Sequence, residues 1–428
     1  MFEFGRDLRR AFSRVRESDD GAWLELISVD LLEAEARQQS IDAGRISCRD
    51  PHVAEIRAAV LWREHARRSG RRDSLMRSLH AAASARREAG AGEEKTARGA
   101  LEMALTLTLK ADLYGGDSCL TAAAVALHEA GAPTGALGAR IVAAHALLST
   151  RHARQANDDA SHFEAGALLD SAIHGLEQAA PGSPEAAELR LERAMLAFEN
   201  GLRRRDGRAL DQAGRELRGL VEACSPDYQP LTRARALALC GGGLSRLGAM
   251  AANAGAVDQG RALLQAAADA FTPDHSPLDW TAIQVALSES AVRAGEPEEA
   301  ELLQNAERLT AGEGLILGAL AAHARTCSDI RSAEASGNLT ALDAVGGRLQ
   351  RRLATGQAAQ APLDWAADQI GLSLAHLARQ RLTGAPVSVD LGVALAEAGL
   401  VAREVGCRPL SDAAGALLAE LRLNLCRS

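Results

Sequence analysis

Histidines have the most obvious capacity for chemistry in this chain, and four of them recur late in successive helical segments. They are His65, His145, His323 and His376. A metal site on a helix needs two ligands three or four positions apart, or ligands that converge from facing helices. No two histidines have that spacing here. The sequence therefore predicts hydrogen-bonding histidines, buried or lining a groove, and it predicts no catalytic residue, no metal site and no cofactor.

A single glycine triplet, Gly241-Gly242-Gly243, could suggest a phosphate-binding loop. Such a loop needs a preceding strand and a G-x-G-x-x-G or G-K-[ST] pattern at the start of a helix. These glycines lie inside a helical segment instead and are followed by Leu244. We expect them to let a neighbouring helix approach closely or to mark a local kink.

The composition limits the class of protein and its partners. A formal charge of −8 argues against nucleic-acid binding, which requires a concentrated basic surface. Hydrophobic residues reach 47% but aromatics only 3%, which favours close-packed Ala/Leu helices over sheets. The seven cysteines contain no C-x-x-C pair, so they indicate neither a disulfide framework nor a zinc site. No secretory signal is visible, and the most apolar run, Leu315–Ala322, is too short to span a bilayer. We expect a cytoplasmic protein.

The sequence predicts a basic amphipathic arm at the N-terminus. Phe4, Leu8 and Phe12 make a narrow apolar stripe among five arginines, which acidic residues partly neutralise. Three interpretations remain open for this N-terminal docking stripe: it caps or docks on the chain's own repeats, it binds a partner, or it contacts a membrane. A membrane contact is expected only through this arm. We assign residues 1–50 to the arm and cap.

Internal repetition predicts the fold. Two stretches are nearly identical, Ser276–Trp280 and Ala361–Trp365, and each opens an Ala/Leu-rich helical segment. Helix-opening signals recur from Pro51 to Pro362 at intervals between 37 residues (Pro277 to Gly314) and 51 residues (Pro133 to Pro184). Each interval holds a second helical segment. This rhythm is typical of a stacked-repeat solenoid, so we predict an all-α protein with about eight helical hairpins over residues 51–428 and a terminal capping helix at Leu410–Leu425.

The repeats resemble the tetratricopeptide-repeat superfamily. This resemblance rests on the Pro-Leu-Asp-Trp helix start and on a small residue eight positions after each Trp, which is Ser288 after Trp280 and Ser373 after Trp365. The resemblance is strongest over Leu231–Gln380. It implies a right-handed superhelix whose first helices line a concave groove. On this register the groove would be lined by Arg235, Ser245, Val285, Glu289, Val292, Ile370, Leu374 and Leu377, with the alternative that these residues pack between repeats.

Solenoids of this kind usually present an extended surface to a partner. The first functional hypothesis is a non-catalytic cytoplasmic adaptor or scaffold that binds a protein or peptide partner in the groove. The second is a regulatory sensor whose groove binds a small peptide or ligand and controls the N-terminal arm. An enzyme is not expected, and the sequence indicates no oligomeric state.

Overall fold

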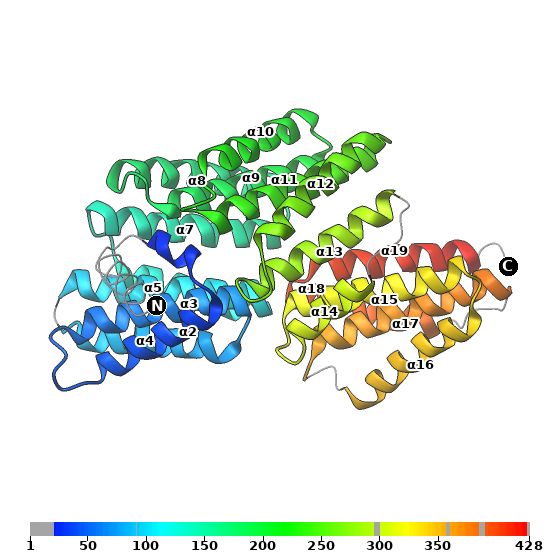
Figure 1. The fold of residues 1–428 in the computed structure, drawn as a ribbon, viewed down its shortest axis with the longest axis horizontal. Helices are drawn as coiled ribbons and strands as arrows, with labels where there is room; N and C mark the ends of the chain where they lie inside the picture. Colours follow the sequence, from blue (N-terminus) through cyan, green and yellow to red (C-terminus); the bar gives the residue numbers. More distant parts are fainter. Residues whose placement is uncertain (1–20, 91, 295–299, 357–359, 385–389, 426–428) are drawn as a thin grey trace, which may run out of the picture. The chain divides into compact units, whose positions relative to one another are not determined.

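The computed structural model describes residues 21–90, 92–294, 300–356, 360–384 and 390–425, and within these ranges every regular element is a helix (Figure 1). These described ranges contain eighteen α-helices, α2–α19, and one short 3-10 helix, η1. The prediction of an all-α helical-repeat fold is therefore confirmed. None of the described helices is long and apolar enough to cross a membrane.

Eight helical hairpins follow one another in the part of the chain that the structure describes, as the repeat rhythm predicts. They are preceded by η1 (Gly21–Leu26) and α2 (Val29–Ala43) and followed by α19 (Arg408–Leu425). The hairpins are α3 (Pro51–Ser69) with α4 (Arg72–Glu88), α5 (Glu93–Tyr114) with α6 (Asp117–Ala130), α7 (Gly135–Ala156) with α8 (Asp159–Ala179), α9 (Pro184–Arg204) with α10 (Gly207–Ala223), α11 (Pro230–Met250) with α12 (Ala254–Ala270), α13 (Pro277–Ala294) with α14 (Ala300–Thr310), α15 (Ile316–Ala335) with α16 (Leu339–Thr355), and α17 (Pro362–Thr383) with α18 (Asp390–Val405).

Local polar residues make the sharp turns inside the hairpins. Asp158, Asp206, Asn253 and Asn338 each precede a second helix, and the side chain of each accepts hydrogen bonds from backbone N–H groups two or three residues further on. These bonds satisfy donors that the first turn of a helix leaves unpaired. At the end of α7, Asn157 takes a left-handed conformation with φ of 54°, which stops the helix one residue earlier.

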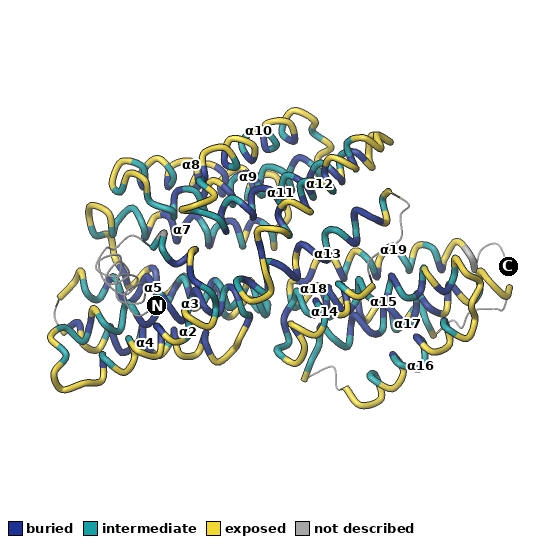
Figure 2. Tube along the Cα trace, viewed as in Figure 1, coloured by how far each residue is buried: buried dark blue, intermediate teal, exposed yellow. Residues whose placement is uncertain are grey.

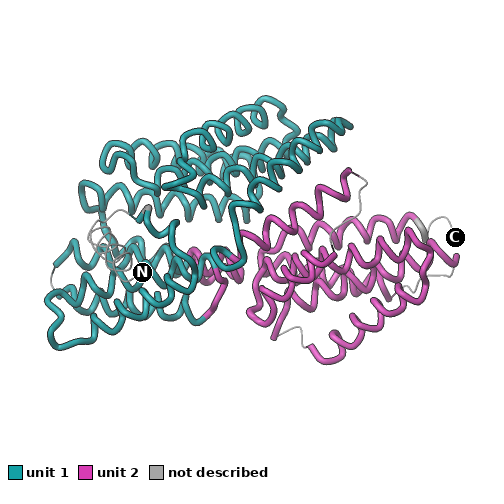
Figure 3. The backbone as a smooth tube through the Cα atoms, in the orientation of Figure 1, with its two compact units in different colours: residues 1–68, 73–107, 122–276 teal, residues 69–72, 108–121, 277–428 magenta. Residues whose placement is uncertain are grey.

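The chain folds into two compact units (Figure 3). Unit 1 comprises residues 1–68, 73–107 and 122–276, and unit 2 comprises residues 69–72, 108–121 and 277–428. The domain division at residue 50 stays a prediction. Within unit 1, α7–α12 form the upper layer of Figure 1 and α2–α5 the lower layer.

Small apolar residues build the cores of both units, and each helix is buried along one face (Figure 2). In unit 2 a core joins α17, α18 and α19, and Trp365 packs against it; its buried members include Leu363, Ala366, Ile370, Leu395, Ala398, Leu410 and Ala414. The predicted terminal helix is thus present. In unit 1, α11 runs unbroken through the glycine triplet and packs on α12, which confirms the predicted close approach at Gly241.

Candidate functional site

A pocket of about 550 Å³ lies within unit 1. Its walls come from the first helices of four successive hairpins, α3, α5, α7 and α9. Residues of η1, of α2 and of the loop Ala180–Ser183 complete the lining. The first helices therefore present one shared concave surface in this part of the chain, and we take this pocket as the candidate site.

Apolar side chains form much of the lining because each helix turns one stripe toward the pocket. On α7 the apolar stripe is Leu137, Ala144 and Leu147, which share one helical face with Arg140 at the spacing of three and four. Leu61, Leu101 and Leu189 line it from the other three helices and are almost fully buried, with at most 4% of each exposed. Such a lining favours a ligand with apolar groups.

Charged side chains stand around this apolar surface, mostly in pairs. Arg63 of α3 contacts Glu102 of α5, with its Nη2 atom 3.0 Å from Oε2. Arg140 of α7 places Nε 2.9 Å from Oε1 of Glu185 on α9. These two ion pairs connect neighbouring first helices, so they fix the spacing of the pocket walls.

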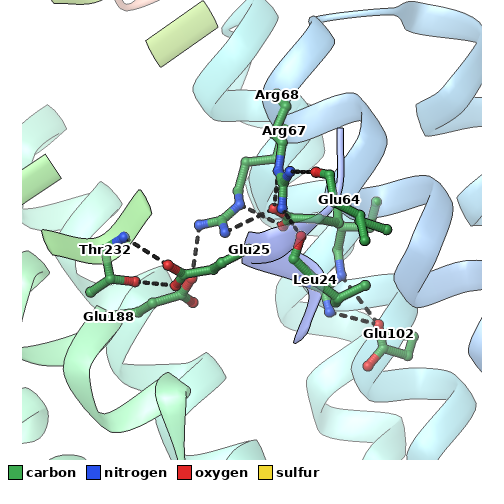
Figure 4. Close-up of polar contacts among 10 residues, drawn as sticks. Leu24, Glu25, Glu64, Arg67, Arg68, Glu102, Glu188 and Thr232 are labelled. Carbon is green, nitrogen blue, oxygen red and sulfur yellow. Dashed lines mark hydrogen bonds and ion pairs between the residues drawn. The ribbon is translucent and has the colours of Figure 1, made fainter. Parts of the chain in front are cut away.

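A buried arginine holds η1 and the residue that follows it, Ile27, against α3 (Figure 4). Arg68 is fully buried, and its Nη1 atom donates to the carbonyl oxygen of Ile27 at 2.8 Å while Nη2 donates to that of Leu24. Its Nε atom donates to Glu64 at 2.7 Å. Burial alone would raise the pKa of Glu64, but the charges of Arg67 and Arg68 outweigh it and hold that pKa well below its usual value.

Arg67 extends this network from Glu64 to α9. Arg67 contacts Glu64 through Nε at 2.7 Å and reaches Oε1 of Glu188 through Nη1 at 2.8 Å. This pair bridges α3 and α9, which are separated by 121 positions at this contact. Arg67 thereby links two helices of the pocket wall, α3 and α9, as Figure 4 shows.

Glu25 of η1 caps α11 from a distant part of the sequence. Its Oε2 atom accepts from the backbone N–H of Leu231 at 2.8 Å and of Thr232 at 3.0 Å, and its Oε1 atom accepts from the Thr232 hydroxyl (Figure 4). His275 lies 2.8 Å from the carbonyl oxygen of Glu25. A carboxylate at a helix N-terminus is favoured by both the free N–H groups and the helix dipole. The segment that carries Trp23 and Leu24 into the pocket lining is therefore held at Leu24, Glu25 and Ile27.

Ion pairs also fix α7 against α9 beyond the pocket. Arg151 and Arg154 of α7 both contact Oε1 of Glu192, at 2.8 and 2.6 Å, and Arg154 reaches Glu199 at 2.8 Å. Burial opposes the charge of Glu192, but the two arginines lower its pKa. These walls are pre-organised, which reduces the cost of ordering them around a ligand.

The groove residues predicted from the repeat register fall in different environments. Ser245, Ile370 and Leu377 are buried in the helix packing, whereas Arg235, Val285, Glu289 and Leu374 are partly exposed and Val292 is exposed. Arg235 and Ser245 belong to unit 1 and the other six to unit 2. None of the eight lines the pocket of unit 1, so the lining of a groove by these residues stays a prediction.

The four recurring histidines also have different surroundings. His65 is buried, and its Nδ1 atom lies 2.8 Å from the Ser74 hydroxyl. His145 and His376 are exposed, and His323 lies between these extremes, 3.5 Å from the sulfur of Cys327. Within the described ranges, no group of three His, Cys, Asp or Glu residues could hold a metal ion. Phe4, Leu8 and Phe12 lie outside the described residues.

Sequence reasoning missed the pocket because it lies where the repeats lack the Pro-Leu-Asp-Trp start. A signal was nevertheless present in the first helices of the early hairpins. Arg98, Leu101, Glu102 and Leu105 of α5 follow the same spacing of three and four as the stripe on α7. Mixed charged and apolar stripes on successive first helices would have indicated a shared lining.

The fold and the pocket define an all-α helical-repeat protein. No protein-family model matches the chain, and no curated protein matches it. Among solved structures the chain is similar to a Rap protein complexed with competence and sporulation factor, at 9% identity and a TM-score of 0.50, over 87% of this chain and 99% of that one. It also aligns with a circular tandem repeat protein with novel repeat topology and enhanced subunit contact surfaces, at 17% identity over 93% of this chain and 96% of that one. The TM-score of this alignment is 0.23, which is too low to indicate a shared fold. The first likeness supports the fold alone.

Proposed function

We propose that the protein is a non-catalytic adaptor or scaffold of diverged tetratricopeptide-like repeats, and that it binds a protein or peptide partner in the pocket of unit 1. The observation that carries the proposal is the lining of one pocket by the first helices of four successive hairpins. An elongated surface built from repeated helices suits an extended segment of polypeptide. The Rap protein of similar fold was solved with a second molecule, the competence and sporulation factor, which is consistent with a binding role for such a fold.

The proposal also rests on the chemistry of the lining. Apolar side chains and ion-paired glutamates surround the pocket, and the acids that line it are engaged by neighbouring side chains. This arrangement favours binding by burial of apolar groups with a few oriented polar contacts. We also propose that the protein is located in the cytoplasm.

A pocket-filling variant tests this function. Leu137→Trp on α7 places a large ring in the pocket, whereas Val142→Trp makes the same kind of change at a position on α7 that is 46% exposed and lies outside the lining. We expect the wild-type chain and Val142→Trp to capture the same partner from native lysate, identified by mass spectrometry, and Leu137→Trp to lose it. Capture of an unchanged partner by Leu137→Trp would show that the pocket is not the binding site.

A second candidate function is a sensor in which the N-terminal arm responds to a ligand in the pocket. It is supported by Gly21, Trp23 and Leu24, which line the pocket and belong to the segment 1–50 that we assign to the arm and cap. The test replaces Phe4, Leu8 and Phe12 by Ser in the full chain. If the arm docks in the pocket, the pocket-lining parts of α5 and α7 should exchange hydrogen faster in this variant than in the wild type. Unchanged exchange there would remove the arm from the function of the pocket.

A further inference from the structure

Four arginines and four glutamates line the pocket of unit 1, and their pairing is uneven. The ion pairs Arg63–Glu102 and Arg140–Glu185 lie within this set. Three more of the eight charged residues are engaged by residues that do not belong to this set. Glu188 pairs with Arg67, Arg98 pairs with Glu94, and Glu35 accepts a hydrogen bond from the amide of Gln39, an uncharged residue of the pocket lining. Seven of the eight charged groups are thus already compensated or hydrogen-bonded.

Arg57 of α3 is the remaining charge. In the described part of the chain, no hydrogen bond, ion pair or ring contact engages its side chain. It is half-buried beside the pocket residues Ile56 and Val60 of the same helix. A guanidinium has five N–H donors in a rigid planar arrangement, and it matches the two oxygens of a carboxylate. Because no protein group that the structure describes engages these donors, they are available to a charged group of a ligand in the pocket.

We propose that the pocket binds a peptide segment in which a carboxylate stands beside apolar side chains, and that Arg57 binds this carboxylate. The inference rests on the proposed function and specifies its ligand. Charge complementarity favours an acidic group, since a basic group would face an uncompensated cation. The apolar stripe of α7 and the buried leucines accept the neighbouring side chains. The walls extend over four first helices, which favours an extended peptide over a compact small molecule.

The experiment presents the full chain to a library of random short peptides and compares it with Arg57→Gln. Arg208→Gln is the matched control because it removes the same charge from an exposed position on α10 that lies outside the pocket. We expect the peptides bound by the wild type to be enriched in Asp or Glu next to Leu, Ile, Val or Phe. For such a peptide, Arg57→Gln should weaken binding about tenfold or more, because a charge-assisted hydrogen bond is lost. It should not weaken binding of the same peptide with Gln in place of the acid.

The outcomes separate this inference from the proposed function. Bound peptides without an acidic preference, or with affinities that Arg57→Gln leaves unchanged, overturn the role of Arg57 but leave peptide binding intact. No peptide enrichment by the full chain overturns the peptide ligand and the role of Arg57, whereas the proposed function is overturned only if Leu137→Trp captures an unchanged partner. Binding of anilinonaphthalene sulfonate that requires Arg57, with no peptide enriched, would identify a small amphiphilic anion as the ligand and overturn the peptide. Circular dichroism of both variants confirms that they fold.

Discussion

Gly241 of α11 and Gly260 of α12 touch through their backbones. A Cβ atom added to either glycine would lie 2.6 Å from the carbonyl oxygen of the other. Such a distance is far below a van der Waals contact, and the obstructing atoms are backbone and cannot rotate away. The two helices of this hairpin therefore pack at a separation that only glycine permits at these two positions.

Substitution of Gly241 by Ala should therefore destabilise the protein. Ala in place of Gly normally favours a helix by about 1 kcal/mol, but here the contact forces the helices apart at a cost of about 1–3 kcal/mol. Gly242, the next residue on α11, has no neighbouring atom within 4 Å of its added Cβ, so Gly242→Ala should stabilise. Urea unfolding of the two variants measures the opposite signs. Equal shifts would contradict the close approach.

Removal of the buried guanidinium of Arg68 should release the N-terminal segment. Arg68→Met eliminates the hydrogen bonds to Leu24 and Ile27 and leaves these carbonyls buried without a donor. Breaking a buried charged contact of this kind costs about 3–5 kcal/mol. We expect faster hydrogen exchange over η1 and a lower urea midpoint. Arg37→Met, which breaks an exposed pair with Glu33, should change stability by only about 0.5 kcal/mol.

Trp365 should stabilise unit 2 locally. It packs partly buried against the core of α17, α18 and α19, and Trp365→Ala should cost about 3 kcal/mol. Because repeats stabilise their neighbours, hydrogen exchange should rise in these three helices and stay unchanged in unit 1. Leu382→Ala, at a position on α17 that is 36% exposed, serves as the control. Native-like exchange in α17–α19 of the Trp variant would show that the ring contributes little to packing.

Asp368 of α17 makes part of unit 2 sensitive to pH. Its Oδ2 atom lies 2.9 Å from Nε of Arg352 on α16, and Nη1 of that arginine also contacts Glu307 at 3.2 Å. Burial raises the pKa of Asp368 from 3.8 to about 6; the charges of Asp364 and Glu307 add to this rise, and Arg352 opposes it. The folded state therefore binds a proton at this carboxyl more tightly than the unfolded chain does.

The sign of the pH dependence follows from that difference. The stability linked to Asp368 is fully present below about pH 4 and is lost as the pH rises through about 6. Asp368→Asn removes this loss, so the stability of the variant relative to wild type should increase by about 2 kcal/mol between pH 4 and pH 7.5. Urea unfolding across this range measures the difference. Asp412→Asn, at an exposed site on α19, is the control. A relative stability that falls with pH would contradict the raised pKa.

The hairpins could be predicted from the sequence because their boundaries are local. Pro184, Pro230 and Pro362 stand in the first turns of first helices, and Asn or Asp residues cap several second helices. The pocket could not be predicted in the same way. Its walls converge only after four hairpins stack, and the contact of Arg67 with Glu188 spans 121 positions. In the sequence, His65–Arg68 resembles ordinary repeat variation, yet Arg68 is fully buried.

The position of Glu25 also determines the order in which a chain leaving the ribosome can complete unit 1. The hairpins need only adjacent sequence and can form as they are synthesised. The amides that receive the Glu25 carboxylate are made 206 and 207 residues later. Contacts at such separation form slowly, because they wait for the distant partner helix. The contact of η1 with α11 is therefore among the last of unit 1 to form, although the contacts of Ile27 and Leu24 with Arg68 span only 41 and 44 positions.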